Sequence, residues 1–213
     1  MIRLLSYIYP ITKKIESAYN GTLEITWFNG KKLLNTKNAN YSYGSLEKIL
    51  KIGLDKIDVN QFKNILLLGL GGGNVIKTLQ QRYAYKGKIT AIEIDPVIVQ
   101  VAKDEFGIFN TDKVSIHCTD AYPFVMKNKE KYDFIIIDLF LDDTIPSQFF
   151  DEAFWKKLTN TQQLLFNASL HDNNKKQLKN IINILQKANF NINKLENVNK
   201  TNILLLADKK YLK

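Results

Sequence analysis

The stretch "NILLLGLGGGNVIKTLQ", residues 64–80, places four glycines within five residues directly after an apolar run. An apolar run that leads through a glycine-rich turn into a helix is typical of the first unit of a doubly wound α/β sheet. We predict a strand over 64–69 and a helix over 74–84. Because glycine lacks a Cβ atom, the turn between them allows a ligand to lie close against the backbone.

Apolar strands alternate with helices along the rest of the chain. Runs such as "FIIID" indicate strands buried on both faces, as in a parallel sheet covered by helices. The predicted strands cover 64–69, 88–94, 113–117, 132–138 and 163–168. The predicted helices cover 74–84, 96–106, 121–127, 148–158 and 172–188. The last two strands, "FNINKLEN" and "TNILLLAD", are joined by too few residues to be parallel. The expected fold is α/β, a doubly wound, seven-stranded, mostly parallel sheet with its last strand reversed. This order of elements is typical of the Rossmann-like methyltransferase fold.

The N-terminal part of the sequence has a different pattern. Asn20-Gly21 and Asn29-Gly30 separate β-prone runs, and such pairs favour type I′ hairpin turns. We predict a three-stranded antiparallel meander over about 13–35, followed by a helix over about 44–56.

Composition bounds the class of protein. The chain has 213 residues and a single cysteine, Cys118, so it can form no intramolecular disulfide, and it fits a reducing compartment. No apolar run approaches the roughly 18 residues of a transmembrane helix, and the N-terminus lacks a signal-peptide cleavage pattern. The sequence therefore predicts a cytoplasmic protein with no membrane association.

The net charge of +9 raises the question of nucleic-acid binding. Residues 1–60 carry 9 basic and 5 acidic side chains, residues 61–150 carry 10 and 11, and residues 151–213 carry 11 and 5. The glycine-rich turn thus lies in the one part with an acidic excess. Only two of the 30 basic residues are arginine, the residue preferred for forked phosphate and guanine contacts. The pattern favours a lysine-rich solvated surface over a nucleic-acid face.

The glycine-rich turn excludes two kinds of cofactor. The dinucleotide fingerprint requires glycine at position 74, where Asn74 stands, and the Lys-Ser/Thr pair of a phosphate-binding loop is absent. What remains is Gly-x-Gly-x-Gly at Gly69, Gly71 and Gly73, with Gly72 between the last two. This pattern suits a backbone that approaches a ribose or an aliphatic tail; the alternative is a turn that only lets the helix pack on the sheet.

Carboxylates follow the next two predicted strands, at the edge where doubly wound sheets bind ligands. Glu93 can accept hydrogen bonds from both ribose hydroxyls, whereas Asp95 before Pro96 is interpreted as a helix N-cap. Asp120 can accept the amino group of adenine, with Ala121 beside the ring, or can cap the helix that begins at 121. Together these positions indicate an adenosyl ligand. No second His or Cys stands at ligand-like spacing, so no metal site is predicted.

The fourth predicted strand ends at Asp138, and Asp142 and Asp143 follow on an expected loop over the cleft. Carboxylates in this place could orient or deprotonate an amine nucleophile. The alternative is that the two loop acids are solvent-exposed.

Several of these segments together resemble the spermidine synthase-like family. They are "GTLEITWFNGKKLL", "YSYGSLEKIL", "ILLLGLGGGNV", "AIEIDPVIVQVAKDEFGI", "CTDAYPFV" and "YDFIIIDLFLDDTIPSQFFDEAFWKKL". The resemblance covers about residues 20–170. It implies an N-terminal β-meander region over 1–42 and a Rossmann-like adenosyl-cofactor-binding domain over 43–213. It also implies that Gly71–Gly73 border the cofactor, that Glu93 and Asp120 hold its ribose and adenine, and that Asp138 is the catalytic aspartate.

The sequence departs from that family at the substrate side. Aminopropyltransferases carry Gly-Gly-Gly-Asp-Gly, whose Asp binds the amine, and here the triplet continues as Asn74-Val75. The Asp-x-x-Asp-Pro pattern is reduced to Asp138 and Asp142. With the substrate side thus reduced, Asp142 and Tyr43 are the predicted substrate-binding residues.

The leading hypothesis is a methyltransferase that uses S-adenosylmethionine on a small-molecule or protein substrate. One alternative is an aminopropyltransferase that uses decarboxylated S-adenosylmethionine to make spermidine or a related polyamine. A second alternative is a non-catalytic adenosyl-binding module that acts through partners. A homodimer is compatible with each hypothesis.

Overall fold

The computed structural model describes residues 2–36, 40–42, 45–141, 144–169, 175–198 and 202–209. Its main element is a seven-stranded sheet in the order β10-β11-β9-β8-β5-β6-β7. The strands are β5 (Asn64–Leu68), β6 (Lys88–Glu93), β7 (Val114–Cys118), β8 (Phe134–Ile137), β9 (Gln163–Ser169), β10 (Phe190–Val198) and β11 (Asn202–Lys209).

The strand directions confirm the predicted topology. Strands β5 to β9 pair in parallel, and β11 lies antiparallel between β9 and β10. The chain order changes direction at β5, which has β6 on one side and β8 on the other. In doubly wound sheets this switch point is where ligands bind, next to the carboxyl ends of the strands.

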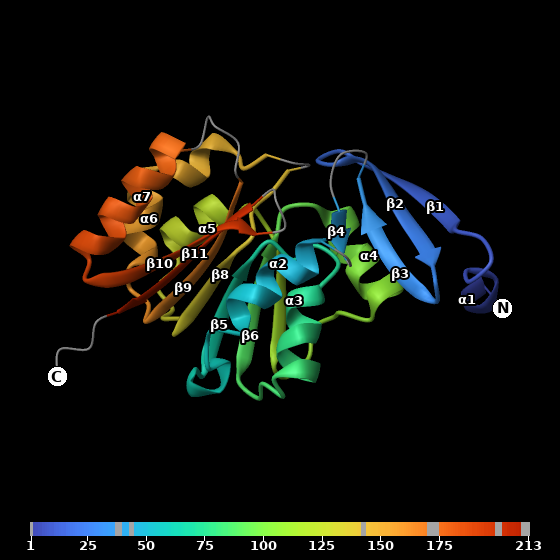
Figure 1. Ribbon diagram of the computed structural model, residues 1–213, viewed down its shortest axis with the longest axis horizontal. Coiled ribbons are helices and arrows are strands. Elements are labelled where there is room, and N and C mark those ends of the chain that lie inside the picture. Colours follow the sequence, from blue (N-terminus) through green and yellow to red (C-terminus); the bar gives the residue numbers. More distant parts are fainter. Residues whose placement is uncertain are drawn as a thin grey trace.

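Helices cover both faces of the sheet, as Figure 1 shows. The main helices are α2 (Ser45–Leu54), α3 (Asn74–Lys77), α4 (Pro96–Phe106), α5 (Ala121–Lys127), α6 (Glu152–Leu158) and α7 (Lys175–Lys187). The apolar side chains of α2, α3 and α4 pack on one face, and those of α5, α6 and α7 pack on the other. Strand β5 shows the consequence, because Ile65 and Leu67 lie in the first core and Leu66 and Leu68 in the second. This two-sided burial explains its continuous apolar run.

Two predicted helices are interrupted. The one predicted over 74–84 is α3 followed by a π-helical turn, η2 (Thr78–Arg82). Arg82 and Tyr83 there contact Asp55, the residue that follows α2. The one predicted over 148–158 is a 3₁₀ turn, η3 (Ser147–Phe150), followed by α6. The break falls at Asp151, whose carboxylate accepts a hydrogen bond from the backbone N–H of Phe154 and so caps a new helix.

The N-terminal sheet has four strands where the sequence predicted three. They are β1 (Ile11–Ser17), β2 (Gly21–Phe28), β3 (Lys31–Asn35) and β4 (Asn40–Ser42). The additional strand β4 pairs with β3. Asn29-Gly30 forms the predicted turn, with positive φ at both residues.

The other predicted hairpin forms between β1 and β2, but its predicted type I′ turn is wrong, because the loop has three residues, 18–20, and only Gly21 of the Asn20-Gly21 pair has a positive φ. In that loop the Ser17 hydroxyl accepts the backbone N–H groups of Tyr19 and Asn20.

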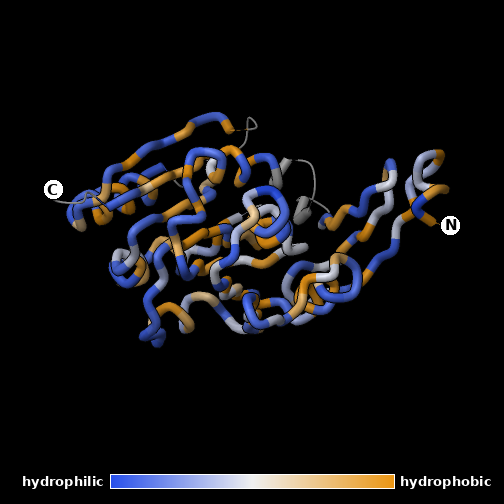
Figure 2. The backbone as a smooth tube through the Cα atoms, turned by 90° about the horizontal axis from the view of Figure 1, so that it is seen from below, coloured by the Kyte–Doolittle hydropathy of each residue, from blue (hydrophilic) through white to orange (hydrophobic). Residues whose placement is uncertain are grey.

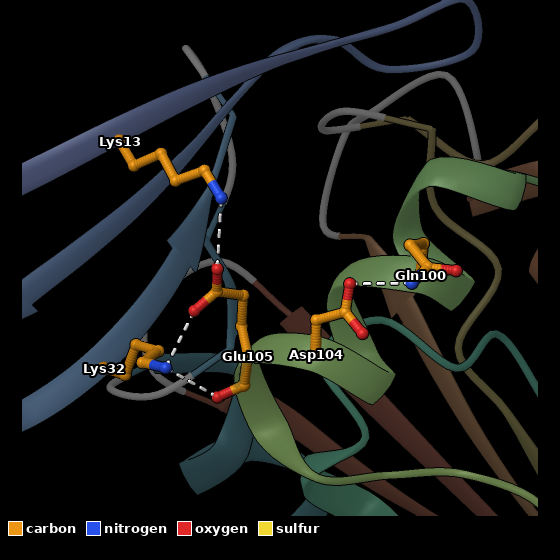
Figure 3. Close-up of polar contacts among 5 residues, drawn as sticks. All are labelled: Lys13, Lys32, Gln100, Asp104 and Glu105. Atoms are coloured by element: carbon orange, nitrogen blue, oxygen red, sulfur yellow. Dashed lines mark hydrogen bonds and ion pairs between the residues drawn. The ribbon is translucent and has the colours of Figure 1, made fainter.

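Apolar residues of this small sheet share a core with the main one, and two sets of polar contacts join it to α4 and to the residue before α4. Lys13 and Lys32 reach Glu105 of α4, with Nζ–Oε distances of 3.3 and 2.8 Å (Figure 3). The hydrogen bond from Lys32 lowers the pKa of the Glu105 carboxyl. The second contact is buried: Ser17 Oγ and Asn20 Nδ2 donate to Asp95 Oδ2 at 2.5 and 2.6 Å.

Asp95 also accepts the backbone N–H of Val97, which confirms its predicted role as the N-cap of α4. The Asp95 side chain thus caps α4, which packs on the main sheet, and accepts two hydrogen bonds from the β1–β2 hairpin.

The first residues form a short helix, α1 (Ile2–Leu5), at the far end of the small sheet from α7 and β10 (Figure 1). Figure 2 shows hydrophobic bands along this stretch, and Leu4 and Ile8 are 73% and 88% exposed. Among the described residues, no helix combines the length and apolar character that crossing a bilayer requires.

Candidate active site

A cavity of about 360 Å³ opens at the carboxyl ends of the parallel strands. Its size falls in the range of small-molecule and cofactor pockets. Seven of the residues singled out from the sequence line it: Gly69, Gly71, Asn74, Glu93, Asp120, Ala121 and Asp138. The topology therefore brings together residues that are up to 69 positions apart in the chain.

Two other predicted site residues, Gly72 and Gly73, are next to lining residues in the chain and do not themselves line the cavity. Tyr43 and Asp142 lie outside the described residues, as does Asp143.

Two glycines of the turn are required for different reasons. Gly69 has φ +95°, and a Cβ atom there would overlap the backbone carbonyl oxygen of Asp138. Gly73 has φ +77°, and a Cβ atom there would lie 2.5 Å from Ile108. The first glycine thus brings the end of β5 against the end of β8 at the cavity. The second serves helix packing, the alternative that the sequence left open for this turn.

Asn74 begins α3 and lines the cavity. Its Nδ2 atom is buried and has no hydrogen-bond acceptor among the residues that the structure describes. A buried amide donor without an acceptor is costly, so this group is a position where a ligand acceptor would be favourable.

Glu93 ends β6 and is nearly fully buried. Its Oε2 accepts the backbone N–H groups of Leu70 and Gly71 at 3.1 and 3.2 Å, and Oε1 accepts that of Asp95 at 3.1 Å. Burial raises the pKa of this carboxyl, and the three backbone donors act in the opposite direction. A carboxylate offers about four acceptor positions, so about one remains for a ligand. That is fewer than the two ribose hydroxyls expected from the sequence.

Asp120 follows β7 and joins three elements. Its Oδ1 accepts the backbone N–H of Tyr122, so it does cap α5. Both oxygens also face Gln148 of η3, whose Nε2 lies 3.2 and 3.3 Å from them. This contact joins η3 to the end of β7 at the cavity.

Asp138 follows β8, and a chain of two buried side-chain amides supports its carboxylate through hydrogen bonds. Asn167 of β9 donates to its Oδ1 at 2.8 Å, and Asn202 of β11 donates to Asn167 Oδ1 at 2.8 Å. Burial raises the pKa of Asp138 to about 6, although the hydrogen bond from Asn167 lowers it. A carboxyl with this pKa is a stronger base than an ordinary aspartate and is still mostly ionised at neutral pH.

The sequence did not predict five further polar residues of the lining: Tyr19, Lys51, Thr78, Thr119 and Gln148. Thr119 precedes Asp120 and could have been included from its position alone. Lys51 and Tyr19 come from α2 and the first hairpin, and only the packing of these elements reveals them. Among the described residues, no group of three or more His, Cys, Asp or Glu side chains is placed to hold a metal ion.

Fold and cavity together define a Rossmann-like fold of the methyltransferase type, with acidic side chains at the carboxyl ends of β6, β7 and β8, the strands around the switch point at β5. The chain belongs to the spermidine synthase-like family. Residues 46–193, more than half of its length, match the family model of the spermine/spermidine synthase domain.

Two curated relatives illustrate the range of this similarity. A polyamine aminopropyltransferase of Vibrio vulnificus is 32% identical over 111 residues, 51% of this chain and 36% of that protein. The mouse eEF1A lysine and N-terminal methyltransferase is 29% identical over 104 residues, 44% of this chain and 15% of that protein. The chain thus spans about a third or less of the length of these relatives.

Among solved structures, human methyltransferase-like protein 13 in complex with SAH superimposes with a TM-score of 0.64 at 21% identity. The match covers 80% of this chain and 85% of that one. At this identity it supports the fold alone.

Proposed function

We propose that the chain is a group transferase that binds an adenosyl-sulfonium donor, with S-adenosylmethionine as that donor and a methyl group as the group transferred. The observation that carries the proposal is the placement of Glu93, Asp120 and Asp138 around one cavity, each at or within two residues of the carboxyl end of a different parallel strand. The family relationship supports an adenosyl ligand for such a site.

The strand order suggests how the donor would lie. Strands β7, β6, β5 and β8 are consecutive neighbours in the sheet. Adenine would lie at Asp120 after β7, and the ribose at Glu93 after β6. The sulfonium would lie over the turn at Gly69 and Gly71 after β5. The transferable group would then point toward Asp138 after β8.

Residues of the chain would position the reactants and exclude water. When bound, the sulfonium supplies an activated carbon, so direct in-line transfer needs mainly alignment of the acceptor. Leu139, Phe140 and Phe149 line the cavity on the side of Asp138 and make that side apolar. Asp138 would orient an amine or hydroxyl acceptor and take up its proton, for which a pKa of about 6 is suitable.

The acceptor we propose is a small molecule or a protein side chain. Asn74 provides no negative charge for a polyamine ammonium group, which favours methyl transfer over aminopropyl transfer. The aminopropyltransferase remains the second candidate, because the matching family model and the Vibrio vulnificus relative carry that activity in their names.

The test separates donor binding from transfer. Calorimetric titration of the full chain with S-adenosylmethionine and with its decarboxylated form measures the two affinities directly. We expect Glu93→Gln to weaken binding and Asp138→Asn to leave it nearly unchanged, with circular dichroism to verify that each variant is folded. Failure of the wild-type chain to bind either donor would overturn both enzymatic proposals.

The transferred group is identified by the product. Methyl transfer releases S-adenosylhomocysteine, whereas aminopropyl transfer from the decarboxylated donor to putrescine releases methylthioadenosine. Release of methylthioadenosine at enzymatic rates would establish the second candidate and refute methyl transfer as the main reaction. Donor binding with no product from either assay, across amine and protein acceptors, would indicate the non-catalytic adenosyl-binding module.

A further inference from the structure

One wall of the cavity carries hydrogen-bond donors, whereas the side at the carboxyl edge of the sheet carries acidic side chains. This donor wall consists of Lys51 on α2, Asn74 on α3 and Thr78 at the start of η2, all of which line the cavity. The described acids of the lining stand at the carboxyl ends of β6, β7 and β8. The cavity is therefore polarised, with positive and donor groups on the α2–α3 side and negative groups along the strands.

Asn74 contributes a donor that needs an acceptor. Its buried Nδ2 has none among the described residues, so an anionic or carbonyl oxygen from a ligand would remove an unsatisfied group. The backbone around it belongs to the turn that follows β5, so this donor lies beside the sulfonium position proposed above.

Lys51 contributes a charge that is available to a ligand. Its Nζ lies 3.4 Å from Asp55 Oδ2, a long contact between half-exposed side chains one helical turn apart. Asp55 also receives the Tyr83 hydroxyl at 2.6 Å and the Arg82 guanidinium at 3.0 Å. These partners, the Tyr83 hydroxyl foremost, hold the pKa of Asp55 below its usual value. Lys51 can therefore turn toward the cavity and still leave Asp55 with a neutralising partner.

We propose that Lys51 and Asn74 form a carboxylate-binding subsite for the α-carboxylate of the donor's methionine part. A lysine ammonium and an amide N–H₂ are both donors, and together they suit an anionic oxygen pair. The decarboxylated donor has only an ammonium group at that end, which Lys51 would repel. The subsite would thus select S-adenosylmethionine, and the inference rests on the function proposed above.

The test uses two ligands that differ at this end of the molecule. S-adenosylhomocysteine carries the carboxylate, and methylthioadenosine retains the adenosine and sulfur without it. Binding of each to the full chain is measured calorimetrically for the wild type, Lys51→Met and Asn74→Asp. Lys48→Met is the matched control, because Lys48 lies on the same helix, is exposed and does not line the cavity.

We expect Lys51→Met to weaken S-adenosylhomocysteine about tenfold, the lower range for a hydrogen bond to a charged group, and to change methylthioadenosine less than about twofold. Asn74→Asp should weaken the carboxylate ligand at least as much, because it places two negative charges together. Lys48→Met should change neither ligand.

Two results would overturn the subsite. Unchanged S-adenosylhomocysteine binding in Lys51→Met would show that the donor's carboxylate is not bound there and would leave an acceptor carboxylate as the other source. Equal weakening of both ligands in a folded Lys51→Met variant would show a structural role for the lysine. If the wild type binds neither ligand, the proposed function itself fails. The wild-type titration alone shows this, so the two kinds of failure are distinguished.

Discussion

Replacing Asp138 by asparagine should make the protein more stable at neutral and alkaline pH. Burial raises the pKa of this carboxyl from its ordinary 3.8 to about 6. Each pKa unit corresponds to about 1.4 kcal/mol, so ionised Asp138 costs the folded state up to about 3 kcal/mol. Asparagine has the same shape, carries no charge and can still accept the hydrogen bond from Asn167.

The sign of the pH dependence follows from which state binds the proton. Below about pH 4 the carboxyl is neutral in both the folded and the unfolded chain and contributes nothing. Between about pH 4 and pH 6 the folded state holds more protons than the unfolded state, so stability falls as pH rises. Above about pH 6 the full cost is present, and there the gain from Asp138→Asn should be largest.

Urea unfolding of wild type and variant at pH 4.5 and pH 8 measures this difference. We expect a gain of about 2 to 3 kcal/mol at pH 8, equivalent to several degrees in Tm, and a much smaller gain at pH 4.5. Asp112→Asn, an exposed acid, is the control and should change stability by less than about 0.5 kcal/mol at either pH. Equal or lower stability of Asp138→Asn at pH 8 would refute the account of the buried charge.

Three further substitutions test the packing and the polar contacts around the cavity. Gly69→Ala should destabilise the fold by about 2 kcal/mol or more in denaturant unfolding, because a Cβ atom there meets a backbone carbonyl; Gly107→Ala, also at positive φ but in open space, should cost only about 1 kcal/mol. Ser17→Ala should cost about 1 to 3 kcal/mol, because it removes a donor from the buried carboxylate that caps α4, and an unchanged midpoint would contradict this. Asn167→Ala should move the acidic limb of the transfer rate's pH profile to higher pH, because its hydrogen bond lowers the pKa of Asp138; an unmoved limb would show that Asp138 does not control it.

Local signals account for most of the fold that the sequence predicted. Helix α4 spans Pro96–Phe106 as predicted, because Asp95 caps its start and Gly107 ends it in the left-handed region. The helices that deviate do so for reasons that apolar periodicity does not show: a cap at Asp151 in one case and a contact with another segment in the other. At the π-helical turn η2, Arg82 and Tyr83 contact Asp55 just after α2, and no spacing within 74–84 encodes that contact.

The same division applies to the candidate site. Glu93, Asp120 and Asp138 could be placed in advance, because each stands at or just past the carboxyl end of a strand of a parallel sheet. Lys51 could not, since it reaches the cavity only through the packing of α2. That packing depends on Gly53, where a Cβ atom would lie 2.5 Å from Leu165 of β9. Such a contact joins positions more than a hundred residues apart and leaves no pattern in either segment.

Because β11 lies between β9 and β10 in the sheet, the sheet cannot be completed until the end of β11 has been synthesised. Strands β5 to β9 are complete about forty residues before β11 has left the ribosome, and until then β9 has an open edge. Asn202, the first residue of β11, donates to Asn167, which in turn holds Asp138. A nascent chain could therefore form the Glu93 and Asp120 side of the cavity while Asp138 still lacks the hydrogen-bond support from β11. We expect catalytic competence to arrive as the final event of folding, so that activity would report completion of the whole sheet.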